Sequence, residues 1–102
     1  MSRYLLTKPA LADLEEILGY IAEDKPGAAE RVGERFASTF DALAMNPAMG
    51  HVREDLMARS VRFWPVYSYL VVYRAETKPL QVLRVLSGYR DIAALLGGPD
   101  QP

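Results

Sequence analysis

The residues best suited to chemistry in this chain gather at the end of its last predicted strand. Residues 80–87 form an apolar run interrupted by Arg84, and a Gly-Tyr-Arg-Asp sequence follows at 88–91. Guanidinium groups stabilise the negative charge that develops on a phosphate during RNA cleavage, and a phenol can protonate the leaving oxygen. Arginines in the preceding loop and strand would add to this charge. The candidate catalytic set for RNA cleavage is therefore Arg59, Arg62, Arg84, Tyr89 and Arg90.

This set lacks an obvious general base, which RNA cleavage through the 2′-hydroxyl requires. Ser87, at the strand end, titrates far too high to accept that proton. His51 is the single histidine, and its position in a loop favours an exposed or capping side chain over a catalytic one. Cysteine is absent, and the sequence has no spacing typical of metal ligands and no glycine-rich phosphate loop. We therefore expect neither a metal nor another cofactor.

Each candidate residue also has a structural explanation. Arg84 can pair with Asp13 or Asp91 at the rim of the sheet, because buried arginines are commonly paired. Asp91 is suited to cap a short helix over residues 92–96, with Gly88 supplying freedom for the turn. Aromatic side chains in an antiparallel sheet more often form its core than stack on bases. The residues to which this applies are Trp64, Tyr67, Tyr69 and Tyr73.

Length and composition limit the class of protein. The 102 residues, 50% hydrophobic and 25% charged, predict one folded domain over residues 1–102, with a flexible tail at about 97–102. The net charge is −1, from 12 basic and 13 acidic residues, so no overall charge attracts nucleic acid, although residues 53–90 are locally basic. The start lacks the apolar core of a secretory signal, and no segment has the ~18 apolar residues of a membrane span. We expect a cytoplasmic protein with no membrane partner.

Hydrophobic periodicity divides the first half into a strand and two helices. Residues 4–6 predict a short strand, after which Thr7 can cap a helix with Pro9 in its first turn. A Pro-Gly pair at 26–27 ends this helix, and an Asn-Pro pair at 46–47 ends the next, so a helical hairpin is expected. The apolar stripe of the first helix is Leu11, Leu14, Ile17, Leu18 and Ile21. The stripe of the second helix is Ala28, Val32, Phe36, Phe40 and Leu43.

The second half is rich in β-formers. Residues 47–60 predict a polar loop, and residues 61–67, 69–74 and 80–87 predict strands. Their short connections imply antiparallel neighbours, and Pro65 places its strand at an edge, a bulge or a kink. The predicted fold is α+β with the order β-α-α-β-β-β, in which an N-terminal helical hairpin packs on a small antiparallel sheet and a short C-terminal helix follows.

Both faces of the predicted sheet are apolar. Because side chains alternate along a strand, Val82 and Leu86 should lie on one face, and Leu83 and Val85 on the other. One helical layer covers one face, so we expect a partner on the other, unless residues 92–96 fold back over it. The candidate partner-binding residues are Leu70, Val72, Leu83, Val85, Arg84 and Arg90.

The order and spacing of several motifs resemble the RelE/ParE superfamily of bacterial toxins. The resemblance covers nearly the whole chain, and its strongest element is the strand of Arg84 with its Gly-Tyr-Arg-Asp ending. It implies the toxin of a type II toxin–antitoxin pair, neutralised by an antitoxin whose tail wraps around it. The motifs are Tyr4-Leu5-Leu6-Thr7, Ala12-Asp13-Leu14-Glu15-Glu16-Ile17, Tyr20-Ile21-Ala22, Pro47-Ala48-Met49-Gly50, Arg59-Ser60-Val61-Arg62, Tyr69-Leu70-Val71-Val72-Tyr73-Arg74 and Leu83-Arg84-Val85-Leu86-Ser87-Gly88-Tyr89-Arg90-Asp91-Ile92.

The resemblance leaves two activities open. RelE-like members cleave messenger RNA on the ribosome, whereas ParE-like members inhibit DNA gyrase without acting as nucleases. Many relatives carry histidine where this chain has Ser87, and the near-neutral charge suits a ribosome-bound nuclease poorly. We therefore predict a ParE-like toxin that is not an enzyme, inhibits DNA gyrase by protein contact and meets nucleic acid only through its antitoxin. The alternatives are a RelE-like ribosome-dependent mRNA endonuclease and a non-toxic antitoxin-binding module.

Overall fold

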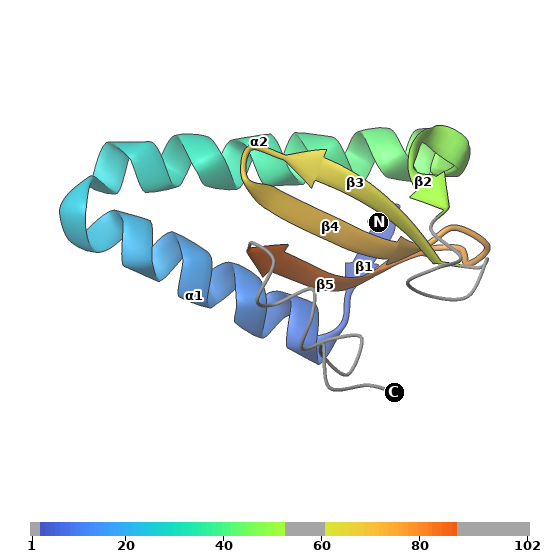
Figure 1. Cartoon of the computed structure of the whole chain (residues 1–102), viewed down its shortest axis with the longest axis horizontal. Helices are drawn as coiled ribbons and strands as arrows, with labels where there is room; N and C mark the ends of the chain where they lie inside the picture. The colour runs from blue at the N-terminus through green and yellow to red at the C-terminus, as the bar shows by residue number, and fades with distance from the viewer. Residues whose placement is uncertain (1–2, 53–60, 88–102) are drawn as a thin grey trace, which may run out of the picture.

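The computed structural model describes residues 3–52 and 61–87, and within them the predicted α+β class is confirmed. A short strand and two helices come first along the chain, and most of the sheet follows them (Figure 1). The predicted C-terminal helix and tail lie outside the described residues. The elements are β1 (Tyr4–Leu6), α1 (Lys8–Asp24), α2 (Pro26–Met45), the 3₁₀ helix η1 (Pro47–Met49), β2 (His51–Val52), β3 (Val61–Val66), β4 (Tyr69–Arg74) and β5 (Leu80–Ser87).

Local signals in the sequence set the bounds of the helical hairpin. Thr7 caps α1, since its Oγ1 accepts a hydrogen bond of 3.3 Å from the Ala10 N–H. Lys25 separates the two helices, and Pro26 begins α2, where its missing N–H costs no helical hydrogen bond. The helix ends at Met45, as predicted from the Asn-Pro pair that follows. None of the described helices is long and apolar enough to cross a membrane.

The sheet has five strands in the order β1-β5-β4-β3-β2. The antiparallel pairing predicted for the second half is confirmed for β3, β4 and β5. β1 differs, because it pairs with β5 in parallel after the chain has passed through both helices. β2 is a further short strand within the predicted loop, and it pairs only with Arg62 and Phe63. Pro65 therefore lies where β3 forms the edge, as its missing N–H predicts.

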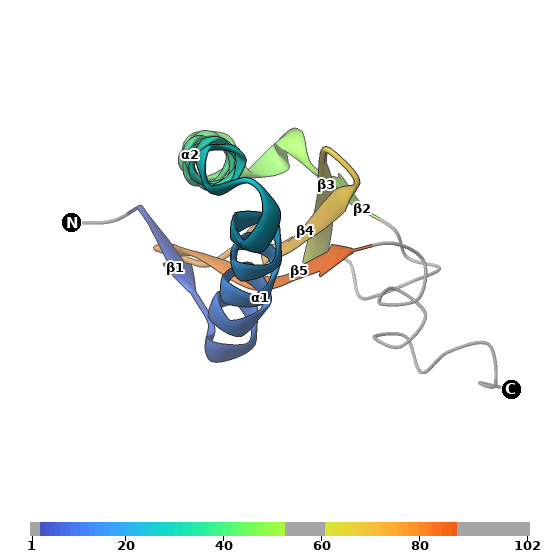
Figure 2. The same ribbon diagram turned by 90° about the vertical axis from the view of Figure 1, so that its left-hand side faces the viewer.

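The main core lies between the helical hairpin and one face of the sheet (Figure 2). Phe36, Phe40 and Leu43 of α2 are fully or almost fully buried there, as predicted. Aromatic contacts join the layers, with ring centroids 5.7 Å apart for Phe36 and Tyr69. Leu11 was predicted in the buried stripe of α1, but it is 47% exposed, because the helix turns Ala10 into the core instead.

A second, smaller cluster lies on the other face of the sheet, and we call it the outer cluster. Its buried members are Val61, Phe63, Val72 and Leu86, and Leu70 and Leu83 pack against them. The side chains of β4 alternate regularly between the two clusters, but the alternation predicted for β5 is wrong, since Val82 and Val85 both belong to the helix-side core. The cause is a register shift: Val72 pairs with Arg84 but Tyr73 pairs with Val82, which leaves Leu83 as an extra residue.

Candidate functional site

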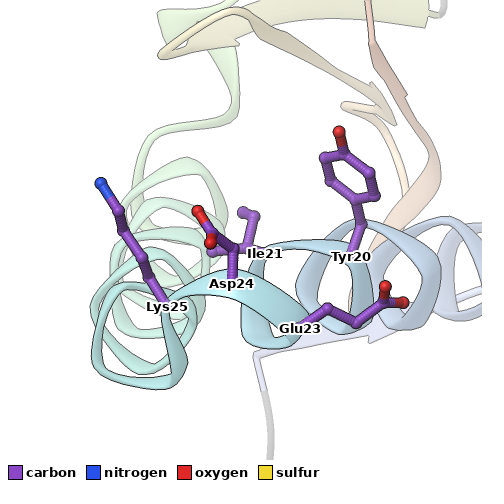
Figure 3. Close-up of a pocket in the computed structure, with 5 residues that line it drawn as sticks. All are labelled: Tyr20, Ile21, Glu23, Asp24 and Lys25. Carbon is purple, nitrogen blue, oxygen red and sulfur yellow. The ribbon is translucent and has the colours of Figure 1, made fainter.

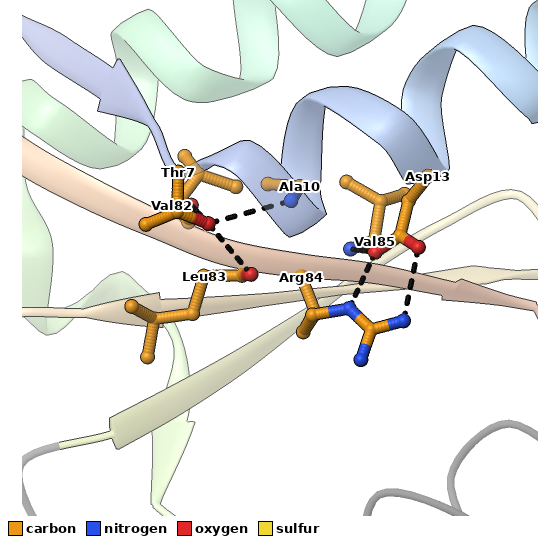
Figure 4. Close-up of polar contacts among 7 residues, drawn as sticks. All are labelled: Thr7, Ala10, Asp13, Val82, Leu83, Arg84 and Val85. Atoms are coloured by element: carbon orange, nitrogen blue, oxygen red, sulfur yellow. Dashed lines mark hydrogen bonds and ion pairs between the residues drawn. The ribbon is translucent and has the colours of Figure 1, made fainter.

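The start of α1 covers the edge of β5 beyond the point where β1 ends. β1 pairs with β5 only as far as Val82. From there the Thr7 N–H donates to the Val82 carbonyl at 3.1 Å, and the Thr7 hydroxyl donates to the Leu83 carbonyl at 2.9 Å. Thr7 therefore caps a helix and pairs with a strand edge at once (Figure 4). These bonds satisfy backbone carbonyls on the β1 side of β5 that would otherwise lack a partner, because β1 ends at Leu6.

Asp13 continues this contact nearly two turns further along α1. Its Oδ2 accepts hydrogen bonds from Arg84 Nε at 2.7 Å and from the Val85 N–H at 2.9 Å, and its Oδ1 accepts one from Arg84 Nη2 at 3.0 Å (Figure 4). The side chains are 18% exposed for Asp13 and 36% for Arg84. The structural explanation predicted for Arg84, pairing with Asp13, is thus confirmed. A bidentate ion pair of this kind fixes the direction of the guanidinium and compensates much of its charge.

Arg62 belongs to a different hydrogen-bond network, which lies at β2 and β3 and not at β5. Its Nη1 donates to the Gly50 carbonyl at 2.8 Å, and the Gly50 N–H donates to the Tyr73 hydroxyl at 2.8 Å. The Tyr73 hydroxyl in turn donates to the Pro47 carbonyl at 2.6 Å. Gly50 has to be glycine here, since a Cβ at this position would lie 2.7 Å from Cε1 of the buried Tyr73 ring. The network fixes the segment that connects α2 to β2.

The described arginines of the predicted catalytic set therefore do not converge on one phosphate. Arg62 lies opposite Tyr73 of the helix-side core, whereas Arg84 lies opposite Val72 of the outer cluster. Directly paired residues share a face of the sheet, so the two arginines start from opposite faces. Both also hold structural hydrogen bonds. Arg59, Tyr89 and Arg90 lie outside the described residues.

The structure also places the residues considered as bases, stacking surfaces or ligands. His51 is exposed, and its ring stacks on Trp64 with centroids 6.2 Å apart, on β2 at the opposite edge of the sheet from Ser87. Tyr73 is buried as predicted for a core residue, but Tyr67 is 64% exposed in the turn after β3. Within residues 3–52 and 61–87, no group of three or more His, Asp or Glu side chains is arranged to hold a metal ion.

The candidate partner-binding residues separate into accessible and buried members. Leu70 and Leu83 are half-buried at the outer cluster, and Arg84 is half-buried at the adjacent edge. Val72 is 1% exposed beneath them, and Val85 is 2% exposed in the helix-side core. Arg90 lies outside the described residues. The accessible surface is therefore formed by Leu70 and Leu83 with Arg84 beside them.

Two of these contacts were missed by reasoning from the sequence. The hydrogen bond from the Val85 N–H to Asp13 needs the knowledge that β5 has a free edge there. The Tyr73–Gly50 contact had one usable signal, because a glycine before a short strand often marks a close approach of other atoms.

Stability should fall at alkaline pH because of Tyr73. Burial raises the pKa of Tyr73 above its usual 10.0, while the Gly50 N–H and the charge of Arg62 lower it by less. The folded state thus holds this proton to a higher pH than the unfolded chain does. The resulting stabilisation is complete below pH 10.0 and is lost as pH rises through the folded pKa. Denaturant unfolding measured at several alkaline pH values should show this decline.

Tyr73→Phe is the matched variant for this effect. It should cost about 1–3 kcal/mol at neutral pH, because the Gly50 N–H loses its acceptor, and it should show a weaker alkaline decline than the wild type. Tyr20→Phe, at a 77% exposed ring, should change neither quantity. An alkaline decline that is the same in wild type and Tyr73→Phe would show that other groups cause it.

Comparison with known proteins assigns the fold and then the family. The fold matches a solved structure titled "Chromosomal ParDE TA system from P. aeruginosa", with a TM-score of 0.69, 20% identity, and coverage of 86% of this chain and 100% of that one. A helical hairpin on a sheet of this topology is therefore a fold found among toxin–antitoxin proteins.

The sequence itself then shows the family. Residues 4–92 match the family described as "ParE toxin of type II toxin-antitoxin system, parDE". The chain is 31% identical over 100 residues to "Toxin ParE3" of Caulobacter vibrioides, covering 95% of this chain and 97% of that protein. It is 33% identical over 84 residues to "Putative toxin Y4kP" of Sinorhizobium fredii, covering 82% and 85% respectively. The chain belongs to the ParE toxin family, within the superfamily that its motifs resemble.

Proposed function

We propose that this ParE-family toxin inhibits DNA gyrase by protein contact, without breaking a bond, and that a cognate antitoxin neutralises it. The family supports the class of activity. The observation that supports contact over catalysis is the separation of Arg62 and Arg84 onto opposite faces of the sheet, each engaged in structural hydrogen bonds. Phosphoryl transfer chemistry needs cations, a base and an acid around the same reacting phosphate.

The environment of Arg84 supports the same conclusion. Its guanidinium is held by Asp13 in a bidentate ion pair, so much of its charge is already compensated. An exposed serine, Ser87, follows two residues after Val85 at the strand end, and the described residues place no histidine near it. A serine hydroxyl is too weak a base to accept a proton at neutral pH, so Ser87 does not replace a histidine as general base.

The antitoxin site that fits these observations is the accessible rim of the outer cluster. Leu70 and Leu83 offer apolar contact on the face of the sheet that the helices leave open, and Arg84 lies next to them at the edge. A few residues near the centre of an interface supply most of its binding free energy when they become fully desolvated. An antitoxin segment with apolar side chains suits this surface.

The proposed activity can be tested with purified toxin and DNA gyrase. Toxin in excess should inhibit supercoiling of relaxed plasmid DNA, and addition of antitoxin should restore it. Wild-type toxin added to translating ribosomes should cause no cleavage of messenger RNA. Arg62→Ala and Arg84→Ala, checked for folding, should cause none either. Unchanged supercoiling together with transcript cleavage would identify an endonuclease instead, and normal growth on induction without the antitoxin would identify a non-toxic binding module.

A further inference from the structure

A furrow runs along one side of α1, formed by three adjoining cavities. The first, of about 160 Å³, lies beside Asp13 and Arg84, and the second, of about 430 Å³, lies between α1 and the ends of β4 and β5. The third, of about 510 Å³, continues to the end of α1 (Figure 3). Glu16 and Ile17 line both the first and the second cavity, and Tyr20 lines both the second and the third. The three cavities therefore form one continuous surface.

The furrow follows a single stripe of the helix. Its lining residues on α1 recur every three or four positions, which places them on the same side of the helix. The stripe extends over roughly 16 Å at the rise of an α-helix, long enough for about three turns of a docked helix. The lining residues of α1 are Asp13, Glu16, Ile17, Tyr20, Ile21, Glu23 and Asp24.

Aromatic and aliphatic side chains form the floor and mouth of the furrow. Ile17 and Tyr69 are half-buried and pack against the helix-side core. Tyr20 stands at the mouth and is 77% exposed, which makes it the most exposed of the large hydrophobic side chains in the described structure. A ring in this position provides apolar surface and a π face for a cation.

The charges that line the furrow are mainly negative. Carboxylates outnumber cations four to two, and Arg84 already compensates Asp13. Lys25 is the other cation, at the far end beside Asp24. Glu16 and Glu23 are exposed, and neither forms a hydrogen bond or ion pair with another residue in the part of the chain that the structure describes. A furrow with an apolar middle section at Ile17, Tyr20 and Tyr69 and with unpaired carboxylates on its rim is complementary to a surface that combines apolar and basic side chains.

We propose that this furrow binds a basic amphipathic segment of the toxin's protein target. The inference rests on the proposed function and adds to it that target and antitoxin use different surfaces. The antitoxin contacts the rim at Leu70 and Leu83, on the open face of the sheet, while the target contacts the stripe of α1 from Glu16 to Glu23. Lysine or arginine side chains of the target pair with Glu16 and Glu23, and an apolar or cationic side chain packs on Tyr20.

Charge-reversal variants of the furrow distinguish the surface proposed for the target from the surface proposed for the antitoxin. Glu16→Lys/Glu23→Lys and Tyr20→Ala should each raise the toxin concentration for half-inhibition of gyrase about tenfold or more, with antitoxin affinity changed by less than about twofold. Glu30→Lys/Glu34→Lys is the matched control, since these carboxylates are exposed on α2 and line none of the three cavities. Equal inhibition by furrow and control variants overturns the inference. Loss of antitoxin affinity with inhibition unchanged also overturns it, because the furrow is then the antitoxin site.

A second measurement does not depend on gyrase. A synthetic amphipathic helix of leucine and lysine is titrated into isotopically labelled toxin, and a leucine–glutamate peptide of the same pattern serves as its control. Chemical-shift changes at Ile17 and Tyr20 support the furrow if Glu16→Lys/Glu23→Lys and added salt each weaken the affinity for the basic peptide about tenfold. This result supports the furrow even if the wild type fails to inhibit gyrase and the proposed function is wrong. No binding of the basic peptide, or equal binding of the acidic one, overturns the inference.

Discussion

Asp13→Ala lowers the free energy of unfolding by about 2–4 kcal/mol, because it removes a bidentate ion pair and the acceptor of the Val85 N–H at once. The carboxylate of Asp13 accepts from both Arg84 nitrogens and from the Val85 N–H, and it joins α1 to β5 across 71 positions of sequence. Burial of the site makes the loss large, since the side chain of Asp13 is only 18% exposed. Denaturant unfolding followed by circular dichroism measures the change.

Two further variants identify the source of this loss. Asp13→Asn keeps an acceptor for one of the donors but removes the charge, so it should lie between wild type and Asp13→Ala. Glu15→Ala, at an exposed neighbour on the same helix, should change stability by less than about 0.5 kcal/mol. If Asp13→Ala were no more destabilising than Glu15→Ala, the contact between α1 and the β5 edge would not contribute to stability.

Leu70→Asp/Leu83→Asp weakens binding of the antitoxin by about 100-fold or more and leaves the toxin active. The physical reason is that two apolar contacts are replaced by carboxylates that lose their hydration in the interface. Cells should then remain arrested even when the antitoxin is expressed, because neutralisation fails while inhibition of the target persists. Titration calorimetry with purified proteins gives the affinity, and growth after co-induction gives the biological result.

The control for this variant needs an apolar side chain of similar exposure elsewhere. Leu11→Asp is suitable, since Leu11 is 47% exposed on α1 and belongs to neither the outer cluster nor the furrow. It should leave antitoxin affinity unchanged. An antitoxin that binds Leu70→Asp/Leu83→Asp as tightly as wild type would place its site elsewhere, provided that the variant keeps the wild-type circular dichroism spectrum.

Much of the fold follows from short-range patterns. Thr7 before Pro9 marks the start of α1, and proline residues mark the turn between the helices and the end of α2. The strands of the second half are recognisable because β-branched and aromatic residues lie between turn residues. The sequence offered Asp13 or Asp91 as the partner of Arg84; the pair with Asp13 needed the structure, and Asp91 lies outside the described residues.

Faces of a strand are harder to assign, because one irregular residue reverses every assignment beyond it. The shift at Leu83 moves Val85 into the helix-side core and Leu86 to the outer cluster, opposite to simple alternation. A bulge has no clear signature in this sequence. It depends on how α1 and β4 meet the two edges of β5, which is a property of the assembled sheet.

The sequence by itself determined the α+β class, the helical hairpin, the strands of the second half and the resemblance to the RelE/ParE toxins, since these depend on local periodicity, capping residues and motif order. Tertiary structure decided the parallel pairing of β1 with β5, the contact of Asp13 with Arg84 and the separation of Arg62 from Arg84 onto opposite faces. These features join residues far apart in the chain. Their register is set by which partners the folded backbone brings together, and no local pattern records it.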